Sequence, residues 1–369
     1  MDIRKLDKNF DTTFVAPEDI EWFSVLEAPF SVRGVFYSED EKLFRRMPKE
    51  AAEAVSEGVG HLSKHTAGGR VRFATDSPYI AIRAEEPFEN PFAHMTMAGR
   101  YGFAIYANQT FAGTVMPSYK QLITADPSLG GNGIITFDGM KKPYVAKEGI
   151  YETEIFLPLY SKLQMMYIGL QKGCTIKAPK EYKHEKPIVF YGSSITQGGC
   201  ASKPGDDYIG RLCRILDTDV INLGFAGNAK GEKAIADYVA AQDASVYVLD
   251  YDHNASQLQH LRDTHFALYE TVRKAHPTSP IIMMTMPTIN EYQTRDGHKK
   301  RRDIIFETIE RAKELGDENI YIIDCYGCFG ELVRGECGTV DNSHPDSLGF
   351  LRMAEALLPT LKKVLGEEI

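Results

Sequence analysis

Residues 187–198 read Pro-Ile-Val-Phe-Tyr-Gly-Ser-Ser-Ile-Thr-Gln-Gly. The first half is a continuous apolar run, which is typical of a strand that a parallel sheet buries on both faces. The glycine and the two serines that follow indicate the end of that strand. We therefore expect Ser194 just beyond the carboxyl end of a buried strand, where its hydroxyl could act as a nucleophile if an imidazole and a carboxylate reach it.

After this strand, short apolar runs alternate with amphipathic helical patterns. This alternation predicts an α/β fold with a doubly wound, flavodoxin-like parallel sheet, whose ligand binds beyond the carboxyl ends of the strands. Ser194, Gly227 and Asn254 each follow an expected strand within a few residues. The expected strands are 188–191, 220–223, 246–249, 281–284 and 320–323, and the expected helices are 208–216, 232–241, 258–274, 302–315 and 348–365.

The first half of the chain has a different pattern, in which turn residues separate many short β-type runs. Such a pattern favours an all-β sandwich of jelly-roll type. Residues 177–187 are charged, bounded by prolines and without hydrophobic period, as expected of a linker. We predict a β-sandwich domain at 1–178, a linker at 179–186 and a catalytic domain at 187–369. The expected strands are 70–74, 79–84, 101–106, 110–116, 133–137, 151–157 and 166–170, after one helix-like stretch at 48–56.

Composition and charge exclude several classes of protein. The chain has 369 residues, of which 43% are apolar and 25% are charged, and its formal net charge of -9 is the wrong sign for binding a phosphate backbone. The N-terminus is charged where a signal peptide needs an apolar core, and the sequence lacks the run of about 18 apolar residues that a membrane span needs. We expect no nucleic-acid or membrane partner, and a cytoplasmic location.

Six cysteines are too few for a disulfide scaffold in a chain of this size. Cys325 and Cys328 have the spacing of a redox pair or of half a zinc site, which Cys337 and His344 could complete. Alternatively, these cysteines are small apolar side chains that fill space after a strand. We expect no metal and no cofactor.

Near the C-terminus, Asp341-Asn-Ser-His344-Pro supplies a carboxylate and an imidazole three residues apart. A serine hydroxyl is a poor nucleophile at neutral pH, so an imidazole must accept its proton, and a carboxylate must orient that imidazole. His344 is the expected base and Asp341 its orienting partner. Pro345 restricts the backbone of His344 and helps to fix its direction.

These segments resemble the short sequence blocks of the SGNH hydrolase superfamily, also called GDSL esterases. The resemblance covers roughly residues 187–365, and the order of the blocks along the chain makes it specific. Ser193 replaces the aspartate of the first block, and only the asparagine of the third block is retained. The matching segments are Gly192-Ser-Ser-Ile195, Asn222-Leu-Gly-Phe-Ala-Gly227, Asp250-Tyr-Asp-His-Asn254 and Asp341-Asn-Ser-His344.

The resemblance implies a role for each matching residue. Ser194 would be the nucleophile, with His344 and Asp341 as its catalytic partners. The oxyanion of the tetrahedral intermediate would be bound by the backbone N–H groups of Ser194 and Gly227 and by the side-chain amide of Asn254.

The N-terminal half more loosely resembles the jelly-roll domain of bacterial two-domain carbohydrate esterases, in particular the acetyl xylan esterases of carbohydrate esterase family 2. This similarity implies an enzyme that removes acetyl groups from acetylated xylan or xylooligosaccharides through an acyl-enzyme. The expected partner is therefore a small-molecule or oligosaccharide ester, and a homo-oligomer is compatible with the architecture. Two alternatives stay open: an acyltransferase to a sugar or natural-product hydroxyl, and a catalytically impaired carbohydrate-binding protein.

Each site residue also has a purely structural alternative. Ser193 and Ser194 could cap a helix, Gly227 could be a turn glycine, and Asn254 or Asp341 could cap the helix that follows. A few neighbouring features are open: Asp252 and His253 could contact substrate, whereas Asp250 could be a buried hydrogen-bond acceptor. Trp22 could stack on a sugar or lie in a core, and residues 288–300 could form a flap.

Overall fold

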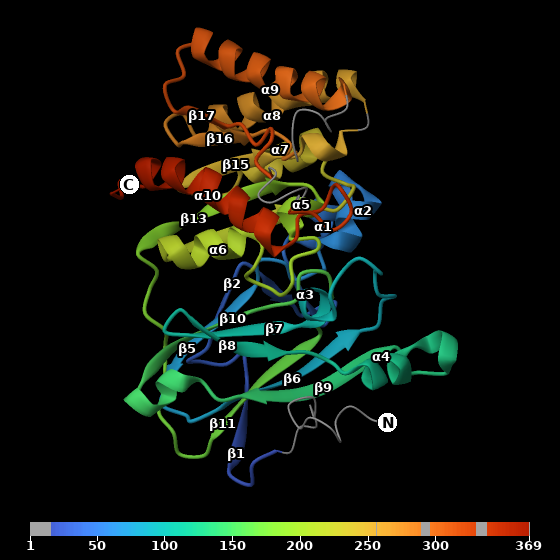
Figure 1. Ribbon diagram of the computed structural model, residues 1–369, viewed down its shortest axis with the longest axis vertical. Coiled ribbons are helices and arrows are strands. Elements are labelled where there is room, and N and C mark those ends of the chain that lie inside the picture. Colours follow the sequence, from blue (N-terminus) through green and yellow to red (C-terminus); the bar gives the residue numbers. More distant parts are fainter. Residues whose placement is uncertain (1–15, 256, 289–295, 330–337, 369) are drawn as a thin grey trace.

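The computed structural model of the protein describes residues 16–255, 257–288, 296–329 and 338–368. The antiparallel sheets of the first half and the parallel sheet of the second half lie one after the other along the longest axis (Figure 1). The predicted combination of an N-terminal β-sandwich and a C-terminal α/β sheet is confirmed.

The parallel sheet has the strand order β14-β13-β15-β16-β17. This is the flavodoxin-like order 2-1-3-4-5, in which the direction of winding reverses between the first and third strands. Ligands of such sheets bind at that reversal, and Ser194 follows directly after the first strand, β13. The strands are β13 (His184–Gly192), β14 (Thr218–Gly224), β15 (Val246–Asp250), β16 (Ile281–Met284) and β17 (Ile320–Ile323).

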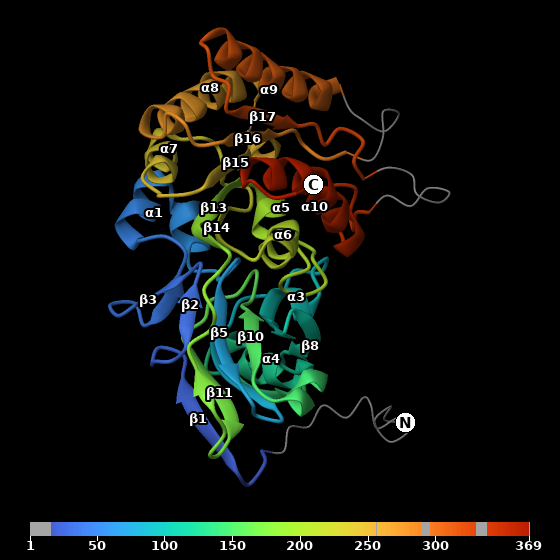
Figure 2. The same ribbon diagram turned by 90° about the vertical axis from the view of Figure 1, so that its left-hand side faces the viewer.

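Helices cover both faces of this sheet (Figure 2). One apolar cluster joins the sheet to α6 and α10, and a second joins its other face to α7, α8 and α9. The short helix α5 and the 3-10 turn η5 lie where strands β13 and β15 end. The elements are α5 (Ser194–Gln197), α6 (Tyr208–Leu216), α7 (Lys233–Ala240), η5 (Asp252–Asn254), α8 (Leu258–Ala275), α9 (Asp296–Glu314) and α10 (Ser347–Val364).

In the described part of the N-terminal half, two large antiparallel sheets have the strand orders β1-β11-β6-β9 and β12-β5-β10-β7-β8, and they enclose a third apolar cluster. Strand β2 pairs with β5, and β3 pairs with β4. The strands are β1 (Ile20–Ser24), β2 (Ser31–Arg33), β3 (Phe36–Ser38), β4 (Leu43–Arg45), β5 (Arg70–Thr75), β6 (Ile80–Pro87), β7 (Phe103–Ala107), β8 (Thr110–Val115), β9 (Ile134–Lys141), β10 (Tyr151–Phe156), β11 (Met165–Gln171) and β12 (Ile176–Lys177).

The N-terminal half also contains helices, of which the sequence predicted only the first. They are α1 (Lys49–Val55), α2 (Glu57–Leu62), α3 (Met97–Tyr101) and α4 (Tyr119–Ala125), with 3-10 turns η3 (Pro127–Leu129) and η4 (Tyr144–Glu148). Each helix is too short to show a clear hydrophobic period.

Helices α1 and α2 pack their buried apolar residues against the C-terminal half. Ala52 and Val59 belong to the same apolar cluster as the core of the parallel sheet. The buried guanidinium of Arg46 donates to the carbonyl oxygens of Asn222 and Gly224, at 3.0 and 2.7 Å. The two halves therefore share buried apolar and polar contacts at the edge of the sheet that carries Ser194.

No helix in the described ranges has the length and apolar character that crossing a lipid bilayer requires.

Candidate active site

Ser194 is the first residue of helix α5, two residues after the end of strand β13. Gly192 permits this tight connection, because a Cβ atom there would collide with Thr196 and with the backbone oxygen of Asp250. Ser193 caps the helix, since its hydroxyl accepts a hydrogen bond from the N–H of Ile195 at 3.1 Å. The structural alternative is thus correct for Ser193, and it leaves the hydroxyl of Ser194 available for another partner.

That partner is His344. The hydroxyl oxygen of Ser194 lies 3.0 Å from Nε2 of His344, and Nδ1 of the same ring lies 2.8 Å from a carboxylate oxygen of Asp341. Because Nδ1 donates to the carboxylate, Nε2 is the nitrogen without a proton and can accept one from Ser194. The three residues thus form a hydrogen-bonded series of the kind that can activate a serine.

The carboxylate of Asp341 is held by backbone N–H groups of residues that follow it in the chain. One oxygen accepts from the N–H groups of His344 and Ser343, at 2.7 and 3.1 Å, and the other faces the imidazole. Partial burial acts to raise the pKa of Asp341, but the hydrogen bonds from His344 outweigh this effect and lower it. The last helix, α10, is capped by Asp346. The alternative role of Asp341 as that cap is therefore wrong.

Gly227 and Asn254 lie on the connections that follow β14 and β15, the two strands that flank β13. Gly227 has φ = 67°, which only glycine adopts readily, and a Cβ atom there would meet open space. The side-chain amide of Asn254 donates to the carbonyl of Phe225 at 3.1 Å, which ties it to the loop of Gly227. The alternative role of Asn254 as a helix cap is wrong, because Gln257 occupies that position in α8.

The amide group of Asn254 has two hydrogens, and the carbonyl of Phe225 uses one. The family resemblance assigns three donors to an oxyanion: the side-chain amide of Asn254 and the backbone N–H groups of Gly227 and Ser194.

The N-terminal half contributes residues that the sequence did not predict. The hydroxyl of Tyr160 donates to the backbone oxygen of Ser194 at 2.9 Å. The ring of His94 lies 5.5 Å from the ring of His344, and Phe92 lies 6.3 Å from Tyr160. Phe92 and His94 are exposed. Only the folding of the sandwich against the catalytic half brings these residues to Ser194, and no local motif marks them.

Behind Ser194 lie buried polar groups. Asp250 accepts hydrogen bonds from the hydroxyls of Thr196 and Tyr208, both at 3.1 Å, and burial raises the pKa of its carboxyl well above the usual range. Burial also raises the pKa of Asp252 to about 7 and lowers that of His253 to about 3. Asp250 is therefore a buried acceptor, the role considered for it from the sequence.

Two sets of three side chains within the described ranges bring possible metal ligands together: His94, Cys200 and His344, and His61, His65 and Glu89. In the second set Glu89 is already paired with Lys162, whose ammonium lies 2.8 Å away.

The zinc set considered from the sequence is not supported by the described geometry. His344 is bonded to Ser194 and Asp341, and Cys337 lies outside the described residues, as do residues 289–295 of the predicted flap. Trp22 lies on strand β1, where the guanidinium of Arg83 stacks on its ring at 4.3 Å.

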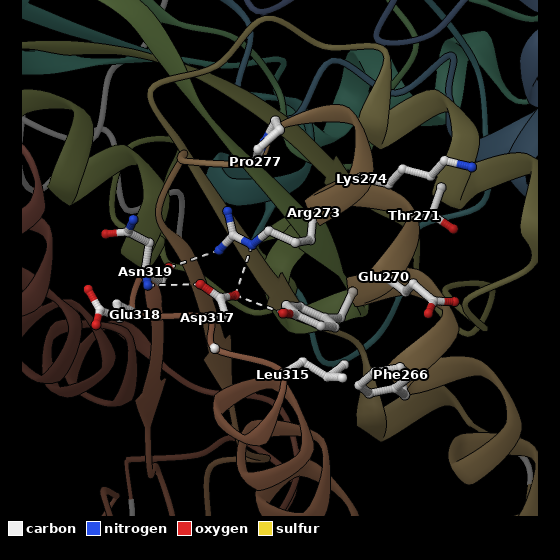
Figure 3. Close-up of a pocket in the computed structure, with 12 residues that line it drawn as sticks. Phe266, Glu270, Thr271, Arg273, Lys274, Pro277, Leu315, Asp317, Glu318 and Asn319 are labelled. Atoms are coloured by element: carbon white, nitrogen blue, oxygen red, sulfur yellow. Dashed lines mark hydrogen bonds and ion pairs between the residues drawn. The ribbon is translucent and has the colours of Figure 1, made fainter.

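A hollow of about 830 Å³ lies between α8 and the segment before β17 (Figure 3). Asn319 immediately precedes β17, so this hollow is at the amino-terminal edge of the sheet, whereas Ser194 follows a carboxyl end. Its central polar groups bond to one another: Asp317 accepts from Arg273 at 2.8 Å and from the hydroxyl of Tyr269 at 2.7 Å. It is therefore separate from the candidate active site.

Two protein families match the chain. Residues 185–362 match the GDSL-like Lipase/Acylhydrolase family, and residues 20–176 match the N-terminus of SGNH-hydrolase-type esterases. No curated protein matches the sequence significantly.

Solved structures resemble the chain over most of its length. A protein of Bacteroides ovatus assigned to the GDSL-like lipases is 28% identical, with a TM-score of 0.80 over 95% of this chain and 99% of that one. The salicylyl-acyltransferase SsfX3 of a tetracycline biosynthetic pathway is 19% identical, with a TM-score of 0.72 over 95% and 99%. The acetyl xylan esterase Est2A of the rumen bacterium Butyrivibrio proteoclasticus is 13% identical, with a TM-score of 0.58 over 94% and 99%.

The two family matches lie side by side in the chain and correspond to its two structural halves. The protein is accordingly a member of the SGNH/GDSL hydrolase superfamily, an SGNH-type esterase or acylhydrolase with the N-terminal region of such esterases ahead of its hydrolase region.

Proposed function

We propose that the protein is a serine esterase that removes short acyl groups, in particular acetyl, from a carbohydrate such as acetylated xylan or xylooligosaccharides. The observation that carries this proposal is the unbroken hydrogen-bonded series from Ser194 through His344 to Asp341, with links of 3.0 and 2.8 Å.

In the proposed mechanism, Ser194 attacks the ester carbonyl while Nε2 of His344 takes the hydroxyl proton. Asp341 stabilises the imidazolium that results. The negative oxygen of the tetrahedral intermediate accepts hydrogen bonds from the N–H groups of Ser194 and Gly227 and from the amide of Asn254. When the intermediate collapses, His344 returns the proton to the departing sugar oxygen, which leaves an acyl group on Ser194. Water then attacks this acyl-enzyme with the same assistance from His344.

The carbohydrate part of the proposal is supported by the side chains around His344. Phe92 is 45% exposed, and the exposed ring of His94 lies 5.5 Å from the catalytic imidazole. Exposed aromatic faces beside a nucleophile suit a sugar ring, which combines apolar C–H faces with hydroxyls. Several of the structures that resemble this chain are carbohydrate esterases of family two.

The proposal is tested with acetylated xylooligosaccharides and p-nitrophenyl acetate as substrates for the wild type and for Ser194→Ala. We expect acetate release by the wild type and a loss of at least about 1,000-fold in the variant. Ser193→Ala is the matched control, because the neighbouring hydroxyl caps the helix and does not contact His344. Equal rates for wild type and Ser194→Ala would refute the proposal.

Acyl transfer to a hydroxyl is the second candidate, and it is favoured by the likeness to the acyltransferase SsfX3 over nearly the whole chain. Both activities use the same acyl-enzyme and differ in the nucleophile that removes the acyl group. Product analysis separates them: hydrolysis releases one acetate for each ester consumed, whereas transfer yields an acetylated acceptor when a sugar alcohol is added. The assembled triad argues against a protein that only binds carbohydrate.

A further inference from the structure

A series of hydrogen bonds runs from the N-terminal half to the loop of Gly227 and passes through Gln197, a buried residue that the mechanism above does not use. Gln197 is the last residue of α5, three positions after Ser194. Its side-chain oxygen accepts from the backbone N–H of Ala226 at 3.1 Å. Ala226 directly precedes Gly227, so this bond holds the peptide next to a proposed oxyanion donor.

The other end of the same amide is fixed by two acceptors. Nε2 of Gln197 lies 3.2 Å from the backbone oxygen of Leu159 and 3.1 Å from Nδ1 of His65. Since Nε2 is the donor, Nδ1 of His65 is the nitrogen without a proton, and the ring proton is on its Nε2. The amide of Gln197 therefore has one orientation that satisfies all of its partners.

His65 is fixed in turn by Glu89. Nε2 of His65 donates to a carboxylate oxygen of Glu89 at 3.1 Å, and Lys162 and His61 contact the other oxygen at 2.8 and 3.2 Å. Burial lowers the pKa of His65 to about 4, so the ring is neutral near pH 7, in agreement with the tautomer that these bonds require. The series thus extends from Glu89 through His65 and Gln197 to the backbone of Ala226.

We propose that Gln197 is a positioning residue for the oxyanion site. His65 of the N-terminal half holds Gln197 in the orientation that fixes the Phe225–Ala226 peptide, next to the N–H of Gly227. This inference rests on the proposed function, because it assigns Gly227 as a donor to the oxyanion. A displacement of about 1 Å at a reacting group can cost about 100-fold in rate, so loss of this support should act on turnover. It also gives the N-terminal half a part in catalysis beyond contact with substrate.

Gln197→Met tests the proposal, since methionine has a similar size and neither donates nor accepts strongly. We expect kcat to fall about 10- to 100-fold, with KM within about twofold, because a donor is misplaced and not removed. A trifluoromethyl ketone, which forms a tetrahedral adduct with serine, should lose affinity by the same factor. Gln242→Met is the matched control, because the side chain of Gln242 donates to the carbonyl of Tyr238 and the residue precedes β15, at the opposite edge of the sheet from Ser194.

A pair of variants at His65 separates positioning from general stability. The side-chain oxygen of His65→Asn can replace Nδ1 as an acceptor, whereas His65→Leu offers none. We expect Asn to restore at least half of the kcat and inhibitor affinity that Leu loses, at comparable Tm. Equal losses in both variants would overturn the proposal, even if Gln197→Met fails to fold. Unchanged kcat and inhibitor affinity in Gln197→Met, with Ser194→Ala inactive, would overturn it too, whereas an active Ser194→Ala would refute the proposed function instead.

Discussion

Replacing Asp341 by asparagine should remove most of the activity, although the two side chains have nearly the same shape. One oxygen of Asp341 accepts from two backbone N–H groups, at 2.7 and 3.1 Å. The oxygen of an asparagine must take that place, since its NH₂ group would oppose the two donors. The NH₂ group then faces Nδ1 of His344 and forces the ring proton onto Nε2, where it prevents acceptance of the proton of Ser194.

The expected loss has two parts. Two unit charges 2.8 Å apart attract by about 6 kcal/mol at an effective dielectric constant of about 20. Asp341 is 37% exposed, so we expect water to reduce this stabilisation of the imidazolium to about 3 kcal/mol. The unfavourable tautomer adds to that loss. We expect kcat/KM to fall by about 1,000- to 10,000-fold, and by no more than in His344→Ala.

The assay is p-nitrophenyl acetate hydrolysis by Asp341→Asn, Asp341→Ala and His344→Ala, after equal Tm values have been shown. Asp341→Ala removes the charge but leaves the tautomer free, so it should be no less active than Asp341→Asn. Activity of Asp341→Asn within tenfold of the wild type would refute this reasoning.

Further predictions concern other parts of the site. Asn254→Ala should keep the fold, measured as Tm, and lose about 100- to 1,000-fold in kcat; an unchanged kcat would show that the third donor lies elsewhere. Burial opposes the charge of Glu89, but His65 and Lys162 outweigh it and lower its pKa from 4.5 to about 2. Glu89→Gln should therefore reduce the free energy of unfolding by up to about 3 kcal/mol at pH 7, and the difference from wild type should shrink below about pH 4.5 and vanish near pH 2 in urea titrations. Burial raises the pKa of Cys200 to about 12, so iodoacetamide at pH 8 should label Cys200 only after denaturation, as mass spectrometry of peptides will show. His94→Ala should raise KM about three- to tenfold for acetylated xylooligosaccharides and leave KM for methyl acetate within twofold. An equal increase in KM for both substrates would show that His94 does not bind the sugar.

The strands and long helices of the catalytic half could be predicted from the sequence because local and tertiary signals agree there. Helix α6 was expected at 208–216 and spans Tyr208–Leu216, since an amphipathic pattern follows Asp207, which caps the helix. Helix α4 was missed because its seven residues are too few for a visible period. The capping box of Ser118 and Gln121 was the signal that could have revealed it.

The residues of the candidate site differ in how far the sequence could identify them. Ser194, His344 and Asp341 lie in segments whose residue types are explained by acyl-transfer chemistry. His65 and Tyr160 reach the site only because the two halves pack together, and neither has a neighbouring motif. Residues of this kind depend on contacts between positions far apart in the chain, which a single sequence does not reveal.

The central claim, that the hydroxyl of Ser194 is activated by His344, is tested most directly by covalent labelling. A fluorophosphonate should modify the protein once, at Ser194, as measured by intact mass and peptide mapping. The labelling rate should fall by at least about 1,000-fold in His344→Ala. Labelling of another residue, or equal labelling of Ser194 in the presence and absence of His344, would contradict the account.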